Sequence, residues 1–506
     1  MLKAVRRGAQ LYVVDPRRTG SAQWARTWLG VNVGTDIALS NAMAHVILAE
    51  QLENRRFIAH STTGFEAYRD SVERWTPELA AEVTGLPADV IRSVARAYAT
   101  APRAIICWTL GITEHHNAVD NVFALINLAL LTGHVGRYGS GLNPLRGQNN
   151  VQGGGDMGAI PDRLPGFQSV ADAALREKFE RAWGNRIPPT RGWRLNEMFE
   201  AMERGEMRAL YVIGENPIVS EADRRRAEHI LSNLACLVVQ DLSLTQTAQI
   251  ADVVLPAAAG WCESEGTVTN SERRVQRVRK IIAAPGEARD DLAIVCDLAR
   301  HMGHEWGNPS AEEVWNELRS LSPMHAGMSY RRLEENDGLR WPCYDEHHPG
   351  ELFLHARLWE EPVRGPLAPF NVVEQEGPVD PLTPEYPLLL TTGRRLDSFN
   401  SGVQSGEYTS PLRRGESLDL SPADAQRYQV SDGEIVRVIS RRGSVEAPVR
   451  LDASLRPGLA FMTFHFDVPT NVLTIEANDP KSGTAEFKAS AIRIEKISQL
   501  QPATGR

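Results

Sequence analysis

The chain has 506 residues, 42% of them hydrophobic, which is enough apolar material for several cores, and we expect two to four domains. A formal net charge of −9 gives no electrostatic reason to expect nucleic acid or an anionic membrane surface as a partner. No apolar run approaches the roughly 20 residues that span a bilayer, so we expect no transmembrane segment.

Cysteine usage indicates a reducing compartment. The five cysteines are scattered without a C-x-x-C pair, a spacing that is not typical of a disulfide framework or a cysteine-ligated cluster. We therefore expect a cytoplasmic protein in which each cysteine packs as a small hydrophobic residue. These residues are Cys107, Cys236, Cys262, Cys296 and Cys343.

The N-terminus leads directly into a turn of the kind that binds ligands. Residues 1–8 are basic, but no apolar core or cleavage site follows, so a signal peptide is not expected. Residues 10–14 are predicted to form a buried strand, with Asp15-Pro16-Arg17 in the turn at its carboxyl end, where open α/β sheets bind ligands. Because the chain starts in the middle of such a unit, we expect an N-terminal truncation.

Helices follow in the next part of the chain. Residues 31–36 are predicted to form a second short strand and turn, in which Asp36 begins a helix that runs to about residue 53. The apolar spacing of residues 119–132 predicts a core helix. His115 and His116 precede it, and we interpret them as surface or supporting groups, because no further metal ligand is suitably spaced. The other predicted elements are helices at 61–68, 76–84 and 87–99 and a strand at 103–108.

Residues 146–158, R-G-Q-N-N-V-Q-G-G-G-D-M-G, are predicted to form a loop, because four side-chain amides and five glycines favour neither helix nor strand. Glycines let the backbone approach a ligand, and Arg146 offers a planar fork for a carboxylate. The alternative is a polar surface loop with incidental glycines. Gly153, Gly155 and Gly158 match G-x-G-x-x-G, but we reject a nicotinamide site, since no strand is predicted to lead into the turn.

A second α/β half follows this loop. Strands are predicted at 209–213 and 236–239, with a helix at 220–233 between them. The strand end at Gln240-Asp241 echoes the one at Asp15, and two such Rossmann-like units suit two copies of a nucleotide-like ligand. Two unrelated α/β units with ordinary capped turns explain the residues equally well.

The sequence pattern changes in the last third of the chain. Residues 300–375 are rich in Pro, Trp and His and are interpreted as an irregular connecting region. From residue 386 short strands alternate with Gly, Asp and Ser turns, at 388–393, 434–440, 443–448 and 459–464, which predicts a β-barrel. The expected domains are therefore two α/β domains at 1–147 and 148–299, a connecting region at 300–380 and a barrel at 381–506.

These residues together carry a family resemblance. The loop from Arg146, with Asp156-Met157-Gly158, resembles the active-site loop of molybdenum or tungsten formate dehydrogenases, within the family of bis-molybdopterin guanine dinucleotide (bis-MGD) oxidoreductases. The resemblance covers essentially the whole chain and implies Rossmann-like α/β domains followed by a C-terminal barrel of the double-psi type. Its other motifs are D-P-R at 15–17, G-T-D at 34–36, G-E-N-P at 214–217, Q-D at 240–241, E-S-E-G-T-V-T-N at 263–270 and E-F-K at 486–488.

The resemblance assigns roles to residues of this chain. Arg146 would hold the carboxylate of formate, with Gln148 beside it in the substrate pocket. The remaining residues would bind the bis-MGD cofactor. For the first guanine dinucleotide they are Asp15, Arg17 and Asp36; for the second, Gly214, Asn216, Gln240, Asp241 and Asp291; and for the pterins, Arg394, Asn471 and Lys488 of the barrel.

One departure from the family limits these expectations. The family has an N-terminal four-cysteine segment for a 4Fe-4S cluster and a selenocysteine or cysteine metal ligand, and neither occurs before residue 10. Cys262 lies beside a pterin-type motif and does not match the metal ligand, so no metal-ligating residue is assigned. We hypothesise that an upstream UGA selenocysteine codon was read as a stop, which an in-frame genomic sequence would test. We expect the 506-residue chain alone to be inactive.

The resemblance also implies a reaction and partners. Formate would be oxidised to CO2, and two electrons would pass to iron–sulfur, NAD-reducing, ferredoxin or hydrogenase subunits. The alternatives are another bis-MGD oxidoreductase, such as a nitrate reductase, and a non-catalytic protein that binds the pterin.

Overall fold

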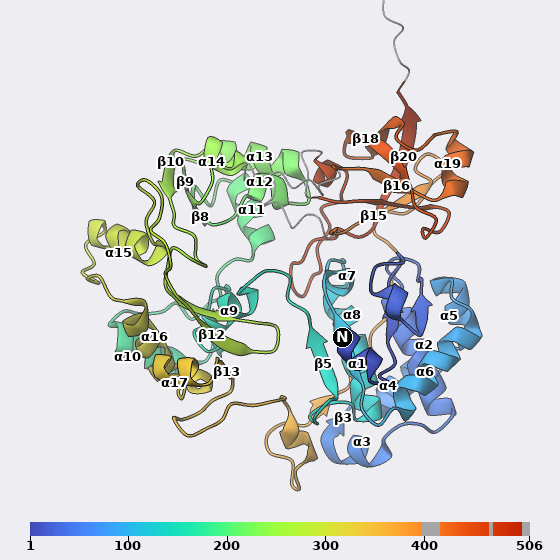
Figure 1. Ribbon diagram of the computed structural model, residues 1–506, viewed down its shortest axis with the longest axis horizontal. Helices are drawn as coiled ribbons and strands as arrows, with labels where there is room; N and C mark the ends of the chain where they lie inside the picture. The colour runs from blue at the N-terminus through green and yellow to red at the C-terminus, as the bar shows by residue number, and fades with distance from the viewer. Residues whose placement is uncertain (396–414, 465–468, 498–506) are drawn as a thin grey trace, which may run out of the picture. The chain divides into compact units, whose positions relative to one another are not determined.

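The computed structural model describes residues 1–395, 415–464 and 469–497, and the chain divides into two compact units (Figure 1). The first unit combines Met1–Leu142, Pro217–Ala227 and His355–Arg506, and the second combines Asn143–Asn216 and Glu228–Leu354. Each unit is built from segments that are distant in the sequence, and the predicted domain boundaries stay a prediction. None of the described helices is long and apolar enough to cross a membrane.

Helix α2 (Asp36–Ala49) lies at the centre of the main core of the first unit (Figure 1). It begins at Asp36, as predicted, and packs against α4, α5, α6 and α8. Because neighbouring helices cover it on several sides, buried residues such as Ile37, Leu39 and Ile47 lie all around it. The helices of this part are α3 (Arg55–Ser61), α4 (Phe65–Val72), α5 (Pro77–Thr84), α6 (Ala88–Thr100), α7 (Leu110–Thr113) and α8 (Ala118–Thr132), with the 3-10 helix η1 (Ala22–Trp24).

The short strands of the first unit differ from the prediction in two places. β1 (Tyr12–Val14) pairs in parallel with β2 (Thr27–Leu29), whereas the strand predicted at 31–36 is a turn in which Gly34 has a φ of 77°. The predicted helix at 61–68 is also wrong. β3 (Thr62–Thr63) pairs with β14 (Ala368–Pro369), and a new helix, α4, starts only after Gly64, which has a φ of 75°. Tertiary pairing thus overrides the local helical pattern. β4 (Ile105–Trp108) lies within the predicted strand.

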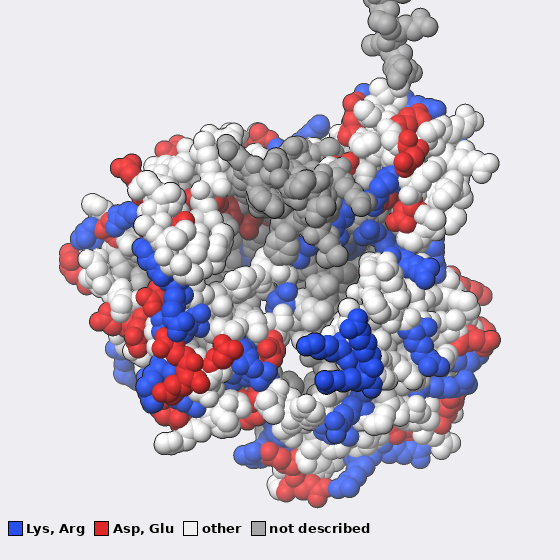
Figure 2. Space-filling model, viewed as in Figure 1, with Lys and Arg blue, Asp and Glu red and all other residues white. Residues whose placement is uncertain are grey.

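The N-terminal helix α1 (Leu2–Arg6) is basic and buries none of its residues. Lys and Arg side chains gather over it in the space-filling view (Figure 2), where α1 carries Lys3 and Arg6 and is followed by Arg7. The net negative charge of the chain is therefore unevenly distributed over its surface.

The predicted barrel at the end of the chain is confirmed. Its strands close in the order β15-β19-β16-β18-β17-β20 around a core of aliphatic residues that includes Leu390, Val438 and Ile492. Alternation between buried and exposed residues along β18 explains why the sequence predicted it. The elements are β15 (Leu388–Thr392), β16 (Leu418–Leu420), α19 (Pro422–Tyr428), β17 (Ile435–Ser440), β18 (Ser444–Leu451), β19 (Leu459–Met462), η4 (Thr470–Val472) and β20 (Ser490–Lys496).

The second unit contains a parallel three-stranded sheet in the order β10-β9-β8, formed by β8 (Ala209–Ile213), β9 (Cys236–Asp241) and β10 (Val253–Pro256). The strands predicted at 209–213 and 236–239 are both present. The helix predicted at 220–233 is instead two helices, α12 (Pro217–Ser220) in the first unit and α13 (Arg224–Ser232), which ends in the second. The other elements before residue 301 are β5 (Gly141–Pro144), α9 (Val151–Asp156), β6 (Arg163–Leu164), β7 (Gln168–Ser169), α10 (Ala173–Trp183), α11 (Leu195–Glu203), α14 (Gln246–Gln249), β11 (Gly266–Thr269), β12 (Arg274–Val278) and α15 (Asp291–His301).

Part of the region from 300 to 375 is more regular than expected. It contains α16 (Ala311–Leu321), η2 (Pro323–His325), α17 (Tyr330–Glu335) and β13 (Leu339–Arg340), followed by η3 (Ala356–Trp359) and β14. β13 adds an edge to the antiparallel pair β11–β12, and Trp315, Tyr330 and Leu333 form a core with Val275 of β12. Helices α16 and α17 bury apolar residues against a sheet, so the segment up to Leu354 is part of the second unit and not only a connection.

Candidate functional site

The Arg146 segment contains a helix that the prediction missed. Residues 151–156 form α9, although three of its six residues are glycines. Asn150 precedes it with a φ of 66°, and its Oδ1 accepts a hydrogen bond of 2.9 Å from the amide of Thr269. A Cβ at Gly153 would lie 2.0 Å from Asn150 Oδ1, so this glycine is required for close packing. Contact with β11 stabilises a helix that propensity alone disfavours.

A strand that was not predicted also precedes this segment. β5 ends at Pro144, so the stated reason for rejecting a G-x-G-x-x-G nicotinamide site, that no strand leads in, is wrong. The geometry still differs from the dinucleotide fingerprint, because Gly153 and Gly155 lie inside α9 and not in a tight turn before the helix.

Arg146 is held by a chain of side-chain hydrogen bonds. Its Nε donates to Gln152 Oε1 at 2.9 Å, and Gln152 Nε2 donates to Asp156 Oδ1 at 2.8 Å. The other oxygen of Asp156 accepts from Trp341 Nε1 at 2.8 Å. Arg146 is exposed, whereas only 1% of Asp156 is exposed. The arginine is thus anchored through its Nε, and among the described residues its two terminal nitrogens make no hydrogen bond or ion pair.

Asp156 is a buried carboxyl group with a strongly shifted pKa. Burial raises the pKa of Asp156 to about 6, although the hydrogen bonds from Gln152 and Trp341 act in the opposite direction. The positive charges of Arg146 and Arg273 also act to lower this pKa. The other predicted substrate residue, Gln148, is exposed, and its side chain has no hydrogen bond within the described part of the chain.

A second group of predicted residues gathers at the carboxyl ends of β8 and β9. Gln240 is fully buried, accepts a hydrogen bond from the hydroxyl of Tyr211 and donates to Asp291 Oδ1 at 2.6 Å. Burial raises the pKa values of both Asp241 and Asp291. Partly exposed carboxylates at strand ends can accept hydrogen bonds from a ribose hydroxyl or a guanine edge.

Gly214 and Asn216 belong to the same edge of this sheet. Gly214 has a φ of 63° and donates its amide to the carbonyl of Gln240 at 2.8 Å. Asn216 is 5% exposed, and its Oδ1 accepts from the hydroxyl of Thr247 at 2.8 Å. Its Nδ2 donates to Gln246 at 2.8 Å. Asn216 therefore fixes the start of α14 beside the strand ends.

In the first unit, Asp15 and Arg17 lie together, as predicted. Asp15 Oδ1 accepts from the amide of Arg17 at 2.8 Å, and burial raises the pKa of Asp15. The guanidinium of Arg17 lies over the ring of Phe461 on β19, with 3.4 Å from Cζ to the ring centroid. Arg17 Nε is buried without a hydrogen-bond partner. A stacked arginine with a donor to spare suits an anionic ligand.

The predicted Asp36 and Lys488 lie near a buried cluster that sequence reasoning did not find. Lys488 pairs with Glu114 at 2.6 Å and donates to the carbonyl of Thr392 at 3.1 Å. Burial raises the pKa of Asp36, and the charge of His115 acts against that shift. Because Lys488 already has a carboxylate partner, its charge is partly compensated without a ligand.

His115 and His116 are not surface residues that act separately, because both contact Glu486. Glu486 Oε2 lies 3.2 Å from His115 Nδ1 and 3.3 Å from His116 Nδ1. Only 2% of His115 is exposed, so of the two predicted alternatives the surface group is wrong for this residue and the supporting group remains. Burial favours the uncharged form of Glu486, but the hydrogen bonds from both histidines outweigh it and lower the pKa of Glu486 to about 2.

The remaining barrel residues contribute polar groups from other loops. Asn471 Nδ2 donates to the carbonyl of Val219 at 3.1 Å, whereas its Oδ1 is buried without a partner. Arg394 is half-buried, and burial lowers its pKa. Asn471 therefore has one acceptor that no protein group satisfies.

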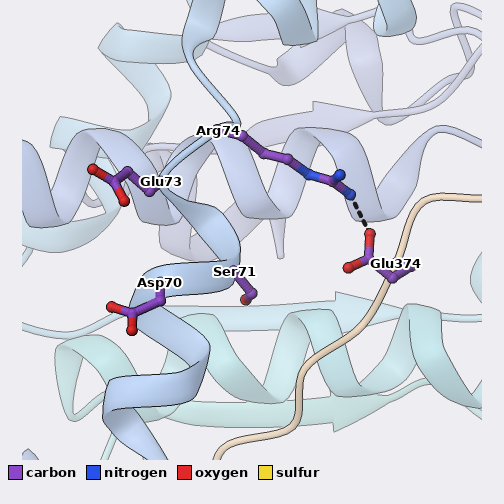
Figure 3. Close-up of a pocket in the computed structure, with 5 residues that line it drawn as sticks. All are labelled: Asp70, Ser71, Glu73, Arg74 and Glu374. Carbon is purple, nitrogen blue, oxygen red and sulfur yellow. Dashed lines mark hydrogen bonds and ion pairs between the residues drawn. The ribbon is translucent and has the colours of Figure 1, made fainter.

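A hollow beside α4 contains none of the predicted residues (Figure 3). Arg74 reaches across it and forms an ion pair with Glu374 (Figure 3). Its only arginine is already paired, and the hollow offers no nucleophile beside a base, so we do not place the functional site there. The residues that line it are Asp70, Ser71, Glu73, Arg74 and Glu374.

Sequence reasoning missed Gln152, Asp156, Trp341 and Phe461 as members of these groups. Asp156 was quoted within a motif but received no role. The available signal was its place four residues after Gln152, since side chains at this spacing meet on a helix. Trp341 and Phe461 left no local signal, because their partners are distant in the sequence.

The fold and these groups define an α/β protein with nucleotide-type strand ends and a closed barrel, and the comparisons specify its class. Residues 1–301 match the family model described as "Molybdopterin oxidoreductase", and residues 388–491 match the "Molydopterin dinucleotide binding domain". The chain therefore belongs to the molybdopterin oxidoreductase family, which confirms the resemblance and the fold class inferred from the sequence.

Individual relatives differ in their described activities. The chain is 40% identical to F420-dependent formate dehydrogenase subunit alpha of Methanocaldococcus jannaschii, over 98% of this chain and 74% of the relative. It is 34% identical to the assimilatory nitrate reductase catalytic subunit of Bacillus subtilis, over 97% of this chain and 71% of the relative. Among solved structures, acetylene hydratase from Pelobacter acetylenicus aligns with a TM-score of 0.70 at 21% identity, over 98% of this chain and 75% of that one, and shows the shared fold.

The residues present fit the bis-MGD cofactor that this family binds, which carries anionic phosphates and guanine edges. Arg17 Nε and Asn471 Oδ1 are buried polar atoms that no group of the described residues satisfies, and such atoms are rare unless a ligand completes them. The partly exposed carboxylate of Asp241 at a strand end can accept from a guanine. Each unit thus supplies side chains whose charge or hydrogen-bonding atoms suit the binding of one dinucleotide.

Proposed function

We propose that this chain belongs to the catalytic subunit of a formate dehydrogenase, in which it takes part in the oxidation of formate to CO2. The observation that supports this function best is the state of Arg146. Its guanidinium is exposed and anchored through Nε, while its terminal nitrogens stay available among the described residues. That planar pair of donors matches the two oxygens of a carboxylate such as formate.

The reaction removes two electrons and a proton from formate and leaves CO2. When bound, bis-MGD supplies a molybdenum or tungsten centre that accepts the two electrons. Arg17, Asp15 and Asp36 of the first unit, and Gly214, Asn216, Gln240, Asp241 and Asp291 of the second, would hold the two dinucleotides. Arg394, Asn471 and Lys488 would contact the pterins. Arg146, with Gln148 beside it, would bind formate and orient its C–H bond, so that binding energy is used for positioning.

Electron-transfer subunits would accept the electrons. The F420 dependence named for the Methanocaldococcus jannaschii relative favours an F420-reducing partner, an acceptor that differs from the NAD-reducing, ferredoxin and hydrogenase partners considered from the sequence. A 4Fe-4S cluster, bound by the four-cysteine segment of the family and not by residues of this chain, would carry electrons between the metal and that partner.

Two dye assays test the proposed function on a cofactor-loaded protein that also carries the cluster- and metal-binding segment of the family, since we expect the 506-residue chain alone to be inactive. We expect formate to reduce an artificial dye and nitrate to leave a reduced dye unoxidised. Nitrate-dependent oxidation without formate activity would assign the chain to the nitrate reductase class instead, which the 34% identical relative makes the relevant alternative.

Substitution of Arg146 tests the role of the residue itself. We expect Arg146→Ala to raise the KM for formate by at least about a hundredfold, which is ~3 kcal/mol for a lost charge-assisted pair, with unchanged metal content. Arg146→Lys keeps the charge without the planar fork and should restore only part of the affinity. A loss of metal in Arg146→Ala would reassign the arginine to cofactor binding.

A further inference from the structure

The hydrogen bonds that hold Arg146 run in one direction. Arg146 donates to the Gln152 carbonyl oxygen, the Gln152 amide nitrogen donates to Asp156, and Trp341 donates to Asp156 from the other side. Asp156 therefore receives donors on both carboxylate oxygens. Asp156 is also the last residue in this series of hydrogen bonds, because an ionised carboxylate accepts hydrogen bonds and donates none.

This direction depends on a side chain at position 156 that only accepts. An ionised carboxylate has no donor, whereas an amide has one acceptor and one donor of nearly the same shape. If an asparagine stood at this position, its oxygen would face Trp341 and its nitrogen would face Gln152. The Gln152 amide would then turn, and its nitrogen would face Arg146 Nε–H, which places a donor against a donor.

We propose that Asp156 is a positioning residue for substrate binding, which fixes the amide of Gln152 and through it the plane of the Arg146 guanidinium. This inference rests on the proposed function only for the identity of the substrate as formate. Asp156 is 1% exposed and both its oxygens are occupied, so it acts through Gln152 and not on the substrate. Asp156 affects substrate binding through geometry. A carboxylate that binds Arg146 through both oxygens needs the guanidinium to be held in one plane.

The proposal predicts a rescue that a purely structural role would not show. Asp156→Asn should raise the KM for formate by about tenfold, the effect of losing one well-placed hydrogen bond, with a smaller change in kcat and no change in metal content. Adding Trp341→Phe removes the opposing donor, so that the oxygen of the introduced amide can turn toward Gln152 and the original direction returns. The double variant should recover most of the affinity, although it removes a further native hydrogen bond.

A measurement without turnover separates this inference from the proposed function. In protein labelled with ¹⁵N-arginine, the Nε–H signal of Arg146 is identified by its loss in Arg146→Lys. We expect slow exchange with water in the wild type, faster exchange in Asp156→Asn and slow exchange again in the Asp156→Asn/Trp341→Phe double variant. Gln152→Met, which leaves the Asp156–Trp341 bond intact, should also speed the exchange, and it serves as a second variant if Asp156→Asn does not fold.

Two outcomes would overturn the proposal: an unchanged Nε–H exchange rate in both Asp156→Asn and Gln152→Met, or a double variant that is weaker in formate binding than Asp156→Asn alone. A wild-type protein that does not oxidise formate but shows the expected exchange pattern would instead reject only the proposed function.

Discussion

Arg17, in the turn after β1, stacks on Phe461 of β19, and the buried Nε of the arginine has no hydrogen-bond partner in the part of the chain that the structure describes. The contact joins the first strand of the first unit to the barrel of the same unit. A guanidinium held in this way keeps its charge while its stem and plane are fixed by the ring, at a gain of about 1–2 kcal/mol for a desolvated cation–π pair. The stacking on Phe461 therefore holds the guanidinium of Arg17 in an orientation in which it can bind an anionic ligand.

We predict that Phe461→Leu lowers the occupancy of the first guanine dinucleotide. The substitution keeps an apolar core residue but removes the ring that orients Arg17. GMP released by acid hydrolysis should fall from about two per chain toward one. Phe167→Leu is the matched control, because Phe167 is exposed and lies under Arg163 at 5.5 Å in the other unit. Equal GMP content in Phe461→Leu and wild type would contradict the role given to this stacking.

Asp241 should control the other dinucleotide. Asp241→Ala removes an acceptor at the end of β9, and we expect about one GMP per chain, with the dinucleotide of the first unit retained. Asp297→Ala, on α15, removes a partly exposed carboxylate paired with Arg289 and Arg300 and should leave the content at two. Loss of both dinucleotides in Asp241→Ala would indicate that the two sites fold or load together.

The parts of the site that the sequence predicted are those encoded by local chemistry. Asp15 and Asp241 follow apolar strands, and Arg146 stands out in a polar glycine-rich run, so each could be found from a few neighbouring residues. The barrel strands β17 and β18 were predictable for the same reason, since buried and exposed residues alternate along them, whereas β16 and β20 were not predicted.

The rest depends on contacts between distant segments. Trp341 reaches Asp156 across 185 positions, and nothing near either residue indicates the other. Helix α9 contradicts the propensity of its glycines, because Asn150 and β11 hold it in place. The buried state of His115 likewise depends on Glu486, 371 positions later. Single-sequence reasoning has no access to such packing.

The stability of the chain should depend on pH through Asp156. Its pKa is raised from 3.8 to about 6 in the folded protein, so the folded state binds this proton more tightly than the unfolded state does. The contribution of Asp156 to the free energy of unfolding is therefore largest below pH 3.8 and is lost as the pH rises through 6. The free energy of unfolding changes by roughly 3 kcal/mol over this range. Asp156→Asn does not titrate, so its unfolding midpoint should improve relative to wild type between pH 4 and 7. Parallel curves for the two proteins, measured without cofactor, would refute this.

The cluster around Glu486 should show the opposite sign at low pH. The pKa of Glu486 is lowered from 4.5 to about 2, so its contribution to stability is present above pH 4.5 and is lost as the pH falls toward 2. The pKa values of His115 and His116 are raised above 6.5, mainly because the hydrogen bonds and charge of Glu486 outweigh the effect of burial. Their contribution is full below pH 6.5 and is lost as the pH rises through the folded-state values. The cluster is most stabilising between pH 4.5 and 6.5.

Glu486→Gln tests this window. At pH 5.5 we expect a loss of about 3 kcal/mol, the low end for removing one partner from a buried ion pair, because the buried His115 loses its paired carboxylate while His116 keeps Glu376. At a pH above the folded-state pKa values of both histidines, the histidines are neutral in both proteins, and the loss should shrink to about 1 kcal/mol, typical of altered neutral hydrogen bonds. Chemical unfolding at the two pH values measures the difference. Glu385→Gln, which removes an exposed partner of Arg493, should cost less than about 1 kcal/mol at either pH. An equal loss for Glu486→Gln at both pH values would show that the histidines do not carry charge in this cluster.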